Sequence, residues 1–370
     1  MIATLAESPS GERSGTVTAC DADVLRWHSP DRHLTIVAND GSLLARASVW
    51  WRATPSAGGQ PTGLIGHYAA GSARVGAEVL ARACALLSSA GCTVAVGPID
   101  GSTWRSYRFV TERGEEPPFL LEPDHPSEWP SHFTDAGFAP WETYVSAVTT
   151  DLEAVDAAAM RAGACLKAAG LSIRSLDRSA IDTEMRRVHA LALESFRENI
   201  LYTPIALEEF RHQQLRLLPV IRPELVLLAE QEGALAGFLL AVPDRPTREE
   251  GTTGTLVLKT VAVAPHMRDR GLGGVLVAEV QHRAAALGFQ RTIHALMHER
   301  NPSTRISHHY ARVFRRYALF ARELPRASGA EPPWSEATPP TDEHVLRLAS
   351  HSVSLPALRA GETLEGRLKT

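Results

Sequence analysis

One stretch of the chain, Thr260–Gly274, limits the fold more than any other. A β-rich run ends at Pro265, and a basic turn containing glycines follows it. Leu272–Leu287 then has the apolar spacing of a helix, which Gly288 ends. The sequence therefore predicts a strand, a tight basic turn and a helix in direct succession.

The predicted turn has the properties of a pyrophosphate-binding site. Backbone N–H groups in the first turn of a helix have no partner within the helix, and the helix dipole adds partial positive charge there. Three glycines, Gly271, Gly273 and Gly274, let the main chain approach phosphate oxygens without a Cβ in the way. Arg268 and Arg270 add charge-assisted contacts.

Other phosphate-binding loops fit this stretch less well. A dinucleotide-binding loop needs G-x-G-x-x-G, but Leu276 stands at the third glycine position. The acidic ribose ligand expected further along is also missing, because that region reads Phe289-Gln290-Arg291. A Walker A loop needs Gly-Lys-Ser/Thr, which is absent. A helix start that binds nothing remains an alternative.

The second half of the chain predicts the element order β-α-α-β-β-β-α-β-α-β, a mixed sheet with helices on both faces. The expected strands and helices are Leu171–Leu176, Ile181–Phe196, Ala206–Leu217, Leu225–Glu230, Ala234–Val242, Thr255–Val263, Leu272–Leu287, Arg291–Met297, Ser303–Phe314 and Tyr317–Arg322. The first half gives a partial copy of this order. The helix–Gly–strand units Arg82–Val96 and Arg283–Leu296 match best, which predicts two similar lobes in tandem with the first degenerate.

The pattern V-A-V-x-P-x-x-R-x-x-G-x-G, from Val261 to Gly273, resembles the acetyl-CoA loop of the GCN5-related N-acetyltransferase superfamily (GNAT). The strand order matches too, and the resemblance covers residues 170–324. It implies an α/β (α+β) fold of two tandem acyl-CoA N-acyltransferase-like lobes, each a mixed, mostly antiparallel sheet flanked by helices. The expected division is 1–150 for the degenerate lobe, 151–169 for a helical connector, 170–324 for the catalytic domain and 325–370 for a C-terminal tail or arm.

The resemblance also implies a set of donor-binding residues. The backbone of Val261, Ala262 and Val263 would bind pantetheine and polarise the thioester carbonyl, and an N–H aimed at the developing oxyanion accelerates acyl transfer. Asn301 would touch pantetheine, and Ser303 would cap the next helix or contact CoA. Backbone amides would bind the pyrophosphate at Arg268, Asp269, Arg270, Gly271, Leu272, Gly273 and Gly274.

The groups that move protons are less well defined by the resemblance. Tyr310 is the nearest match to the tyrosine that protonates the leaving thiolate, although its spacing from Asn301 is longer than usual in the family, and packing is the alternative. The strand before the loop lacks a carboxylate base, so His294, Glu194 or Glu198 are alternatives, as is the absence of any dedicated base. Tyr202 and Glu198, between the first two helices, are the expected substrate contacts.

Composition limits the remaining classes of function. The formal net charge of −4 and a pI near 6.4 argue against a nucleic-acid binder. Four cysteines fit neither a zinc pair nor a disulfide framework, and no secretory signal or membrane span is visible, so we expect a cytoplasmic protein that binds no membrane. His298-Glu299 lacks the second His of a zinc motif, so no metal is expected.

The function predicted from these features is an N-acyltransferase (acetyl-CoA dependent). It transfers an acetyl group from acetyl-CoA, the co-substrate, to a small-molecule or peptide amine. The cleft between the lobes, or a contact in a homodimer, would shape the acceptor site. Alternatives are an aminoacyl-tRNA-dependent peptide transferase and a non-catalytic CoA- or metabolite-binding protein. Within the first lobe, Trp104, Arg105, Tyr107 and Arg108 either bind an anionic ligand or face the second lobe.

Overall fold

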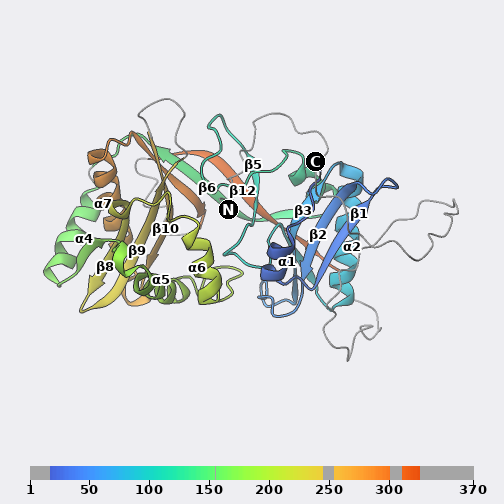
Figure 1. The fold of residues 1–370 in the computed structure, drawn as a ribbon, viewed down its shortest axis with the longest axis horizontal. Coiled ribbons are helices and arrows are strands. Elements are labelled where there is room, and N and C mark those ends of the chain that lie inside the picture. The colour runs from blue at the N-terminus through green and yellow to red at the C-terminus, as the bar shows by residue number, and fades with distance from the viewer. Residues whose placement is uncertain (1–16, 155, 245–253, 301–310, 326–370) are drawn as a thin grey trace, which may run out of the picture.

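The computed structural model describes residues 17–154, 156–244, 254–300 and 311–325, and a single twelve-stranded sheet runs through it (Figure 1). In spatial order the strands are β1 (Arg32–Val37), β2 (Leu43–Trp50), β3 (Thr62–Ala70), β4 (Val94–Gly97), β12 (Arg312–Glu323), β6 (Ala139–Thr149), β11 (Arg291–His298), β10 (Thr255–Val263), β9 (Ala234–Pro243), β8 (Val226–Gln231) and β7 (Ser172–Ser175), with β5 (Phe109–Glu112) paired to β12. The sheet is mixed and mostly antiparallel, as the sequence predicts.

The two halves of the chain are joined by an exchange of strands at the centre of the sheet. β6, from the first half, pairs antiparallel with β11 of the second half. β12, the last strand of the described residues, lies between β4 and β6 and pairs with both. β12 therefore completes the first half of the sheet, and β6 continues the second half.

A parallel strand–helix–strand unit occurs in each half. In the first, β3 and β4 are parallel and α2 (Ala73–Ser89) connects them. In the second, β10 and β11 are parallel and α7 (Leu272–Ala286) connects them. These are the two units that the internal sequence match picks out.

The other helices flank the sheet. α4 (Ala157–Ala168) packs on α7, and α5 (Ile181–Ser195) packs on β9, β10 and α6 (Leu207–Leu215). In the first half, α3 (Trp129–Asp135) packs on α2 and β5, while α1 (Ala22–His28) precedes the sheet. Short 3-10 turns occupy Arg178–Ala180, Pro223–Leu225 and Pro265–Met267. No helix in the described ranges is both long enough and apolar enough to cross a membrane.

Each half has its own hydrophobic core, and a third cluster connects them. The connecting cluster places Trp50 and Ile99 of the first half together with Leu201 of the second and Tyr317 of β12. Tyr317 is completely buried, and its hydroxyl is bonded to Ser146 at 2.9 Å and to Glu122. Burying these side chains together stabilises the junction of the two halves through the hydrophobic effect.

Three elements differ from the sequence-based expectation. The helix expected at Ser303–Phe314 is wrong at its end, because Arg312 and Val313 already pair with β6. Its earlier part lies outside the described residues. α1 was not expected because it buries none of its residues and so has no apolar stripe. β5 was not expected because only its first two residues are buried.

Candidate functional site

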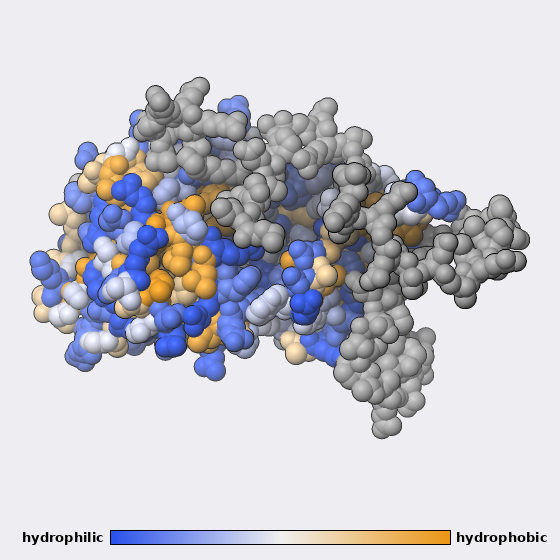
Figure 2. Space-filling model, viewed as in Figure 1, coloured by the Kyte–Doolittle hydropathy of each residue, from blue (hydrophilic) through white to orange (hydrophobic). Residues whose placement is uncertain are grey.

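A cavity of about 1060 Å³ lies between the two halves of the chain. The first half contributes the loop that contains Trp104 and Arg108, and the second contributes α5, α6 and the middle of the sheet. Figure 2 shows apolar surface, in orange, on this face of the second half. Apolar lining with a few polar groups is typical of a small-molecule site.

The parallel strands β10 and β11 separate at this cavity. They pair only from Thr255 to Leu258, opposite Arg291 to His294. Beyond that point β10 continues to Val263 against β9, whereas β11 continues against β6. Between the separated strands, backbone N–H and C=O groups have no strand partner on one side within the described residues, so this gap can take up an extended ligand that carries amides.

Side chains bind the backbone of β11 in the region where the two strands have separated. β11 has a register shift between His294 and Met297, and Leu296 within it adopts a φ of 57°. The Leu296 N–H donates to Ser146 Oγ at 3.0 Å, and its carbonyl accepts from Arg108 at 3.0 Å. Both backbone groups of Leu296 are therefore hydrogen-bonded to side chains, so this residue of β11 requires no backbone hydrogen bond with β10.

The glycine turn joins β10 to α7 at one end of this gap. Asp269 (φ 61°) and Gly271 (φ 79°) both have left-handed backbone conformations. A Cβ on Gly271 would lie 2.7 Å from Ala162 Cβ in α4, so glycine is required for both its conformation and its size. The Gly271 carbonyl accepts from Val275, which starts α7 and leaves the first-turn N–H groups facing outward.

The two arginines of the turn differ in their surroundings. Arg268 donates to Glu198 at 2.5 Å and to the Ser195 carbonyl at 3.2 Å. Glu198, expected at the acceptor, therefore lines the cavity as the ion-pair partner of the loop. Arg270 is exposed beside Met267, whose buried side chain anchors the turn. Arg270 is thus the cation of the turn most accessible to an anion.

The expected catalytic and substrate residues are only partly brought together. His294 lies at the point where β10 and β11 separate and lines the cavity. Tyr202 also lines it, but its hydroxyl donates to the Leu193 carbonyl at 3.0 Å and its ring packs on Trp104. Glu194 is exposed on α5 and is not part of the cavity wall. Asn301, Ser303 and Tyr310 lie outside the described residues.

The His294 imidazole is neutral near pH 7. It is 4% exposed, and burial lowers its pKa to about 4. Its Nε2 lies 3.3 Å from Gln281 Nε2. A neutral imidazole of low pKa can accept or donate a hydrogen bond, but it is a weak general base.

Arg108, which the sequence predicts either to bind an anion or to face the second lobe, lines the cavity together with Lys259, which was not predicted as a site residue. Lys259 lies at the register shift of β10, between Leu258 and Thr260. Burial, and then the charge of Arg108, lower the Lys259 pKa to about 8. The available sequence signal was a single lysine in an otherwise apolar strand.

The loop that carries Arg108 packs against the second half. Trp104 Nε1 donates to the Thr203 carbonyl at 2.8 Å, and the Trp104 ring contacts Phe196 and Phe210. Arg105 forms a two-pronged ion pair with Glu209, at 2.7 and 3.0 Å. Of the two expectations for this loop, packing therefore holds for Trp104 and Arg105.

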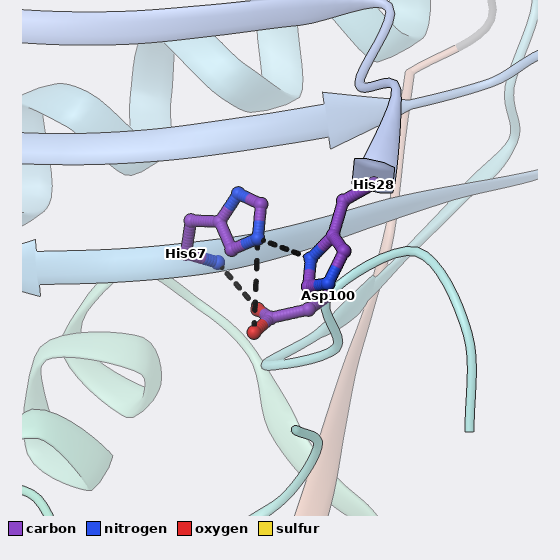
Figure 3. Close-up of side chains that lie close together, drawn as sticks. All are labelled: His28, His67 and Asp100. Atoms are coloured by element: carbon purple, nitrogen blue, oxygen red, sulfur yellow. Dashed lines mark hydrogen bonds and ion pairs between the residues drawn. The ribbon is translucent and has the colours of Figure 1, made fainter. Parts of the chain in front are cut away.

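A cluster of His28, His67 and Asp100 lies at the first-half wall of the cavity (Figure 3). His28 Nδ1 and His67 Nε2 are 2.8 Å apart, and Asp100 Oδ1 accepts from the His67 backbone N–H at 2.6 Å. Burial and then the Arg105 charge lower the His28 pKa to about 4.

The ligand atoms of this cluster lie within 4.8 Å of one another, which is close enough to hold a metal ion. The neighbouring Arg105 cation opposes a second positive charge there. The expectation of no metal stays a prediction.

Comparison with known proteins finds a family match in the second half of the chain. Residues 186–312 match the family model described as the Acetyltransferase (GNAT) family, and no curated protein matches the chain. A GCN5-related N-acetyltransferase from Sphaerobacter thermophilus is similar in structure, with 16% identity over 78% of this chain and 80% of that one and a TM-score of 0.44. A tandem GNAT protein from the clavulanic acid biosynthesis pathway has 15% identity over 84% and 90%, with a TM-score of 0.43. L-PGS from Bacillus licheniformis has 10% identity over 78% and 83%, with a TM-score of 0.37.

Proposed function

We propose that the GNAT domain formed by residues 186–312 makes this protein an acyl-CoA-dependent N-acyltransferase that transfers an acetyl group from acetyl-CoA to an amine. The observation that carries the proposal is the gap between β10 and β11. It opens into the cavity, and the same strand β10 leads into the glycine turn at the start of α7. An extended arm with a pyrophosphate at one end matches this arrangement.

The chain's own groups account for donor binding. Pantetheine would lie along β10 and hydrogen-bond with backbone groups of Val261–Val263 that β9 does not use, beside Ser195, whose Oγ donates to the Val263 carbonyl at 2.9 Å. Its pyrophosphate would meet the first-turn N–H groups of α7, with the charge of Arg270 beside them. Gly271 permits the close approach, because its backbone is left-handed and carries no Cβ.

Transfer itself needs one attack and two proton movements. The neutral amine attacks the thioester carbonyl, so a C–N bond forms and the C–S bond breaks. A backbone N–H of β10 next to the carbonyl would stabilise the oxyanion. The nitrogen then loses a proton, and the thiolate gains one. We assign the second proton to Tyr310 by family resemblance and leave the first to solvent, because His294 is too weak a base.

The test is release of free CoA thiol from acetyl-CoA in the presence of a panel of amines. We expect turnover with at least one class of amine, and acylated amine detected by mass spectrometry in equal amount. Arg270→Glu should raise the KM for acetyl-CoA by about tenfold or more, because it places a negative charge beside the pyrophosphate. Binding of acetyl-CoA without turnover of any amine would instead indicate a binding protein.

A further inference from the structure

Two cations that are at least partly buried in the cavity wall lack an acidic partner among the described residues, and Arg108 is the first. It is 6% exposed, and its guanidinium carbon lies over the rings of both Tyr107 and Tyr144, 3.7 and 4.0 Å from their centroids. Arg108 also has a left-handed backbone, with φ at 72°. The strained backbone and the two rings fix the direction of this side chain.

One edge of the Arg108 guanidinium has a donor without a hydrogen-bond partner among the described residues. Nη1 donates to the Leu296 carbonyl of β11 at 3.0 Å. Nε is buried and has no hydrogen-bond partner among the described residues. A buried donor without a partner costs about 1–3 kcal/mol, so this edge is stabilised by any ligand that accepts from it. A planar carboxylate is the group that fits an arginine edge best.

Lys259 is the second cation. It lines the same cavity from β10, and within the described ranges no hydrogen bond or ion pair involves its side chain. The charge that acts on it is the like charge of Arg108. Two neighbouring cations in a half-buried site repel each other, and a bound anion reverses that cost.

The carboxylates that line the cavity are already engaged. Asp100 accepts from the His67 N–H, Glu122 binds Arg315 at 2.5 Å, Glu184 binds Arg174 at 2.7 Å and Glu198 binds Arg268. None of these bonds reaches Arg108 or Lys259. Among the described residues no cavity carboxylate is left as a counter-ion for the two cations, so we assign that role to a ligand.

We propose that Arg108 and Lys259 bind the carboxylate of the acceptor, so that the amine substrate is an amino acid or a short peptide whose carboxylate lies near its amine. The inference rests on the proposed acyltransfer. Lys259 lies two residues before Val261, where the thioester would bind, and Arg108 reaches Leu296 on the facing strand. The carboxylate is thus held close to the carbonyl that the amine attacks.

The experiment compares amines that differ only in the carboxylate. Each amino acid is assayed with acetyl-CoA beside its carboxamide and the amine left by decarboxylation. We expect kcat/KM to favour the carboxylate by at least about tenfold, which corresponds to one charge-assisted hydrogen bond. Lys259→Met should abolish the preference, while Lys259→Arg should keep most of it. Arg216→Gln, an exposed cation at the same cavity, is the matched control and should leave it unchanged.

The outcomes separate this inference from the proposed function. Wild-type protein that binds no acetyl-CoA contradicts the acyltransfer itself. Turnover with equal rates for carboxylates and carboxamides overturns the carboxylate site alone. A preference for succinyl-CoA with uncharged amines, lost in Lys259→Met, would assign the carboxylate to the acyl group and also overturn it.

A binding measurement covers amines that are not turned over. With CoA present, thermal stabilisation by an amino acid should exceed that by its carboxamide, and Lys259→Met should remove the difference. Equal stabilisation by both compounds, together with no difference in turnover, refutes the site.

Discussion

Gly271→Ala tests whether α4 and the glycine turn form one close-packed unit. An L-residue at φ 79° costs about 1–2 kcal/mol because its Cβ meets the backbone. The new Cβ would also lie 2.7 Å from Ala162 Cβ, well inside ordinary contact, and overpacking of this kind costs about 1–3 kcal/mol. We expect a total loss of roughly 2–5 kcal/mol in the free energy of unfolding.

Two further variants separate these costs. Gly41→Ala meets the same left-handed strain, at φ 86°, with nothing within 4 Å of the new Cβ. Ala162→Gly makes room for the Cβ at residue 271, at a cost of about 0.5–1 kcal/mol for glycine in a helix. The double variant Ala162→Gly/Gly271→Ala should therefore be more stable than the sum of the single losses by about 1 kcal/mol or more.

Urea unfolding of the four variants measures the coupling, and calorimetry with acetyl-CoA measures the turn. We expect Gly271→Ala to weaken binding and the double variant to recover part of it, since the loop regains its position. If Gly271→Ala lowered the free energy of unfolding no more than Gly41→Ala does, the close packing of α4 on the turn would be refuted. Strictly additive losses in the double variant would refute it too.

Three further predictions concern charges. Glu198→Gln should tighten acetyl-CoA binding severalfold by calorimetry, because it frees Arg268 and removes a negative charge near the pyrophosphate; unchanged binding would argue against the loop as the donor site. Burial, then the charges of His28 and Arg46, lower the His67 pKa from 6.5 to about 3. The unfolded chain therefore takes up a proton first, and stability should be lost as pH falls from 6.5 toward 3; a flat unfolding free energy from pH 7 to 5 would contradict this. Arg105→Ala should lower the free energy of unfolding by about 3 kcal/mol, because it leaves the Glu209 carboxylate half-buried and unpaired. The double variant Arg105→Ala/Glu209→Ala should lose less stability, and a larger loss in the double variant would refute the ion pair.

The second half of the chain follows from its sequence because local signals agree with one another. The strand Thr255–Val263 and the helix start at Leu272 are where the pattern predicts them, since apolar periodicity, Pro265 and the glycines all mark the same boundaries. Gly271 indeed has the left-handed backbone that motivates a glycine there.

The exchange of strands could not be predicted from local signals. β12 starts at Arg312 because it pairs with β6, a strand about 160 residues earlier in the chain. The sequence of neither strand indicates which strand it will pair with. Because of this exchange the two lobes share one sheet, and the predicted domain boundaries at residues 150 and 170 do not describe that sharing. The predicted boundaries stay a proposal.

The cavity depends on contacts that appear only in three dimensions. The position of the Arg108 side chain depends on the turn around it and on Tyr144 of β6, and not on its sequence neighbours alone. Glu198 was expected to touch substrate, yet it pairs with Arg268, because α5 ends beside the turn. Spacing indicated that these residues were near the site but not which partner each would have.

The most direct measurement is calorimetric binding of acetyl-CoA to the full chain, to Arg270→Glu and to Arg26→Glu. Arg26 is an exposed arginine of α1 in the first half, so its substitution changes net charge equally without touching the turn. The account predicts micromolar binding by the wild type and the control, and a loss of about tenfold or more in Arg270→Glu. Folded wild-type protein that binds no acetyl-CoA, or equal binding by all three, would contradict it.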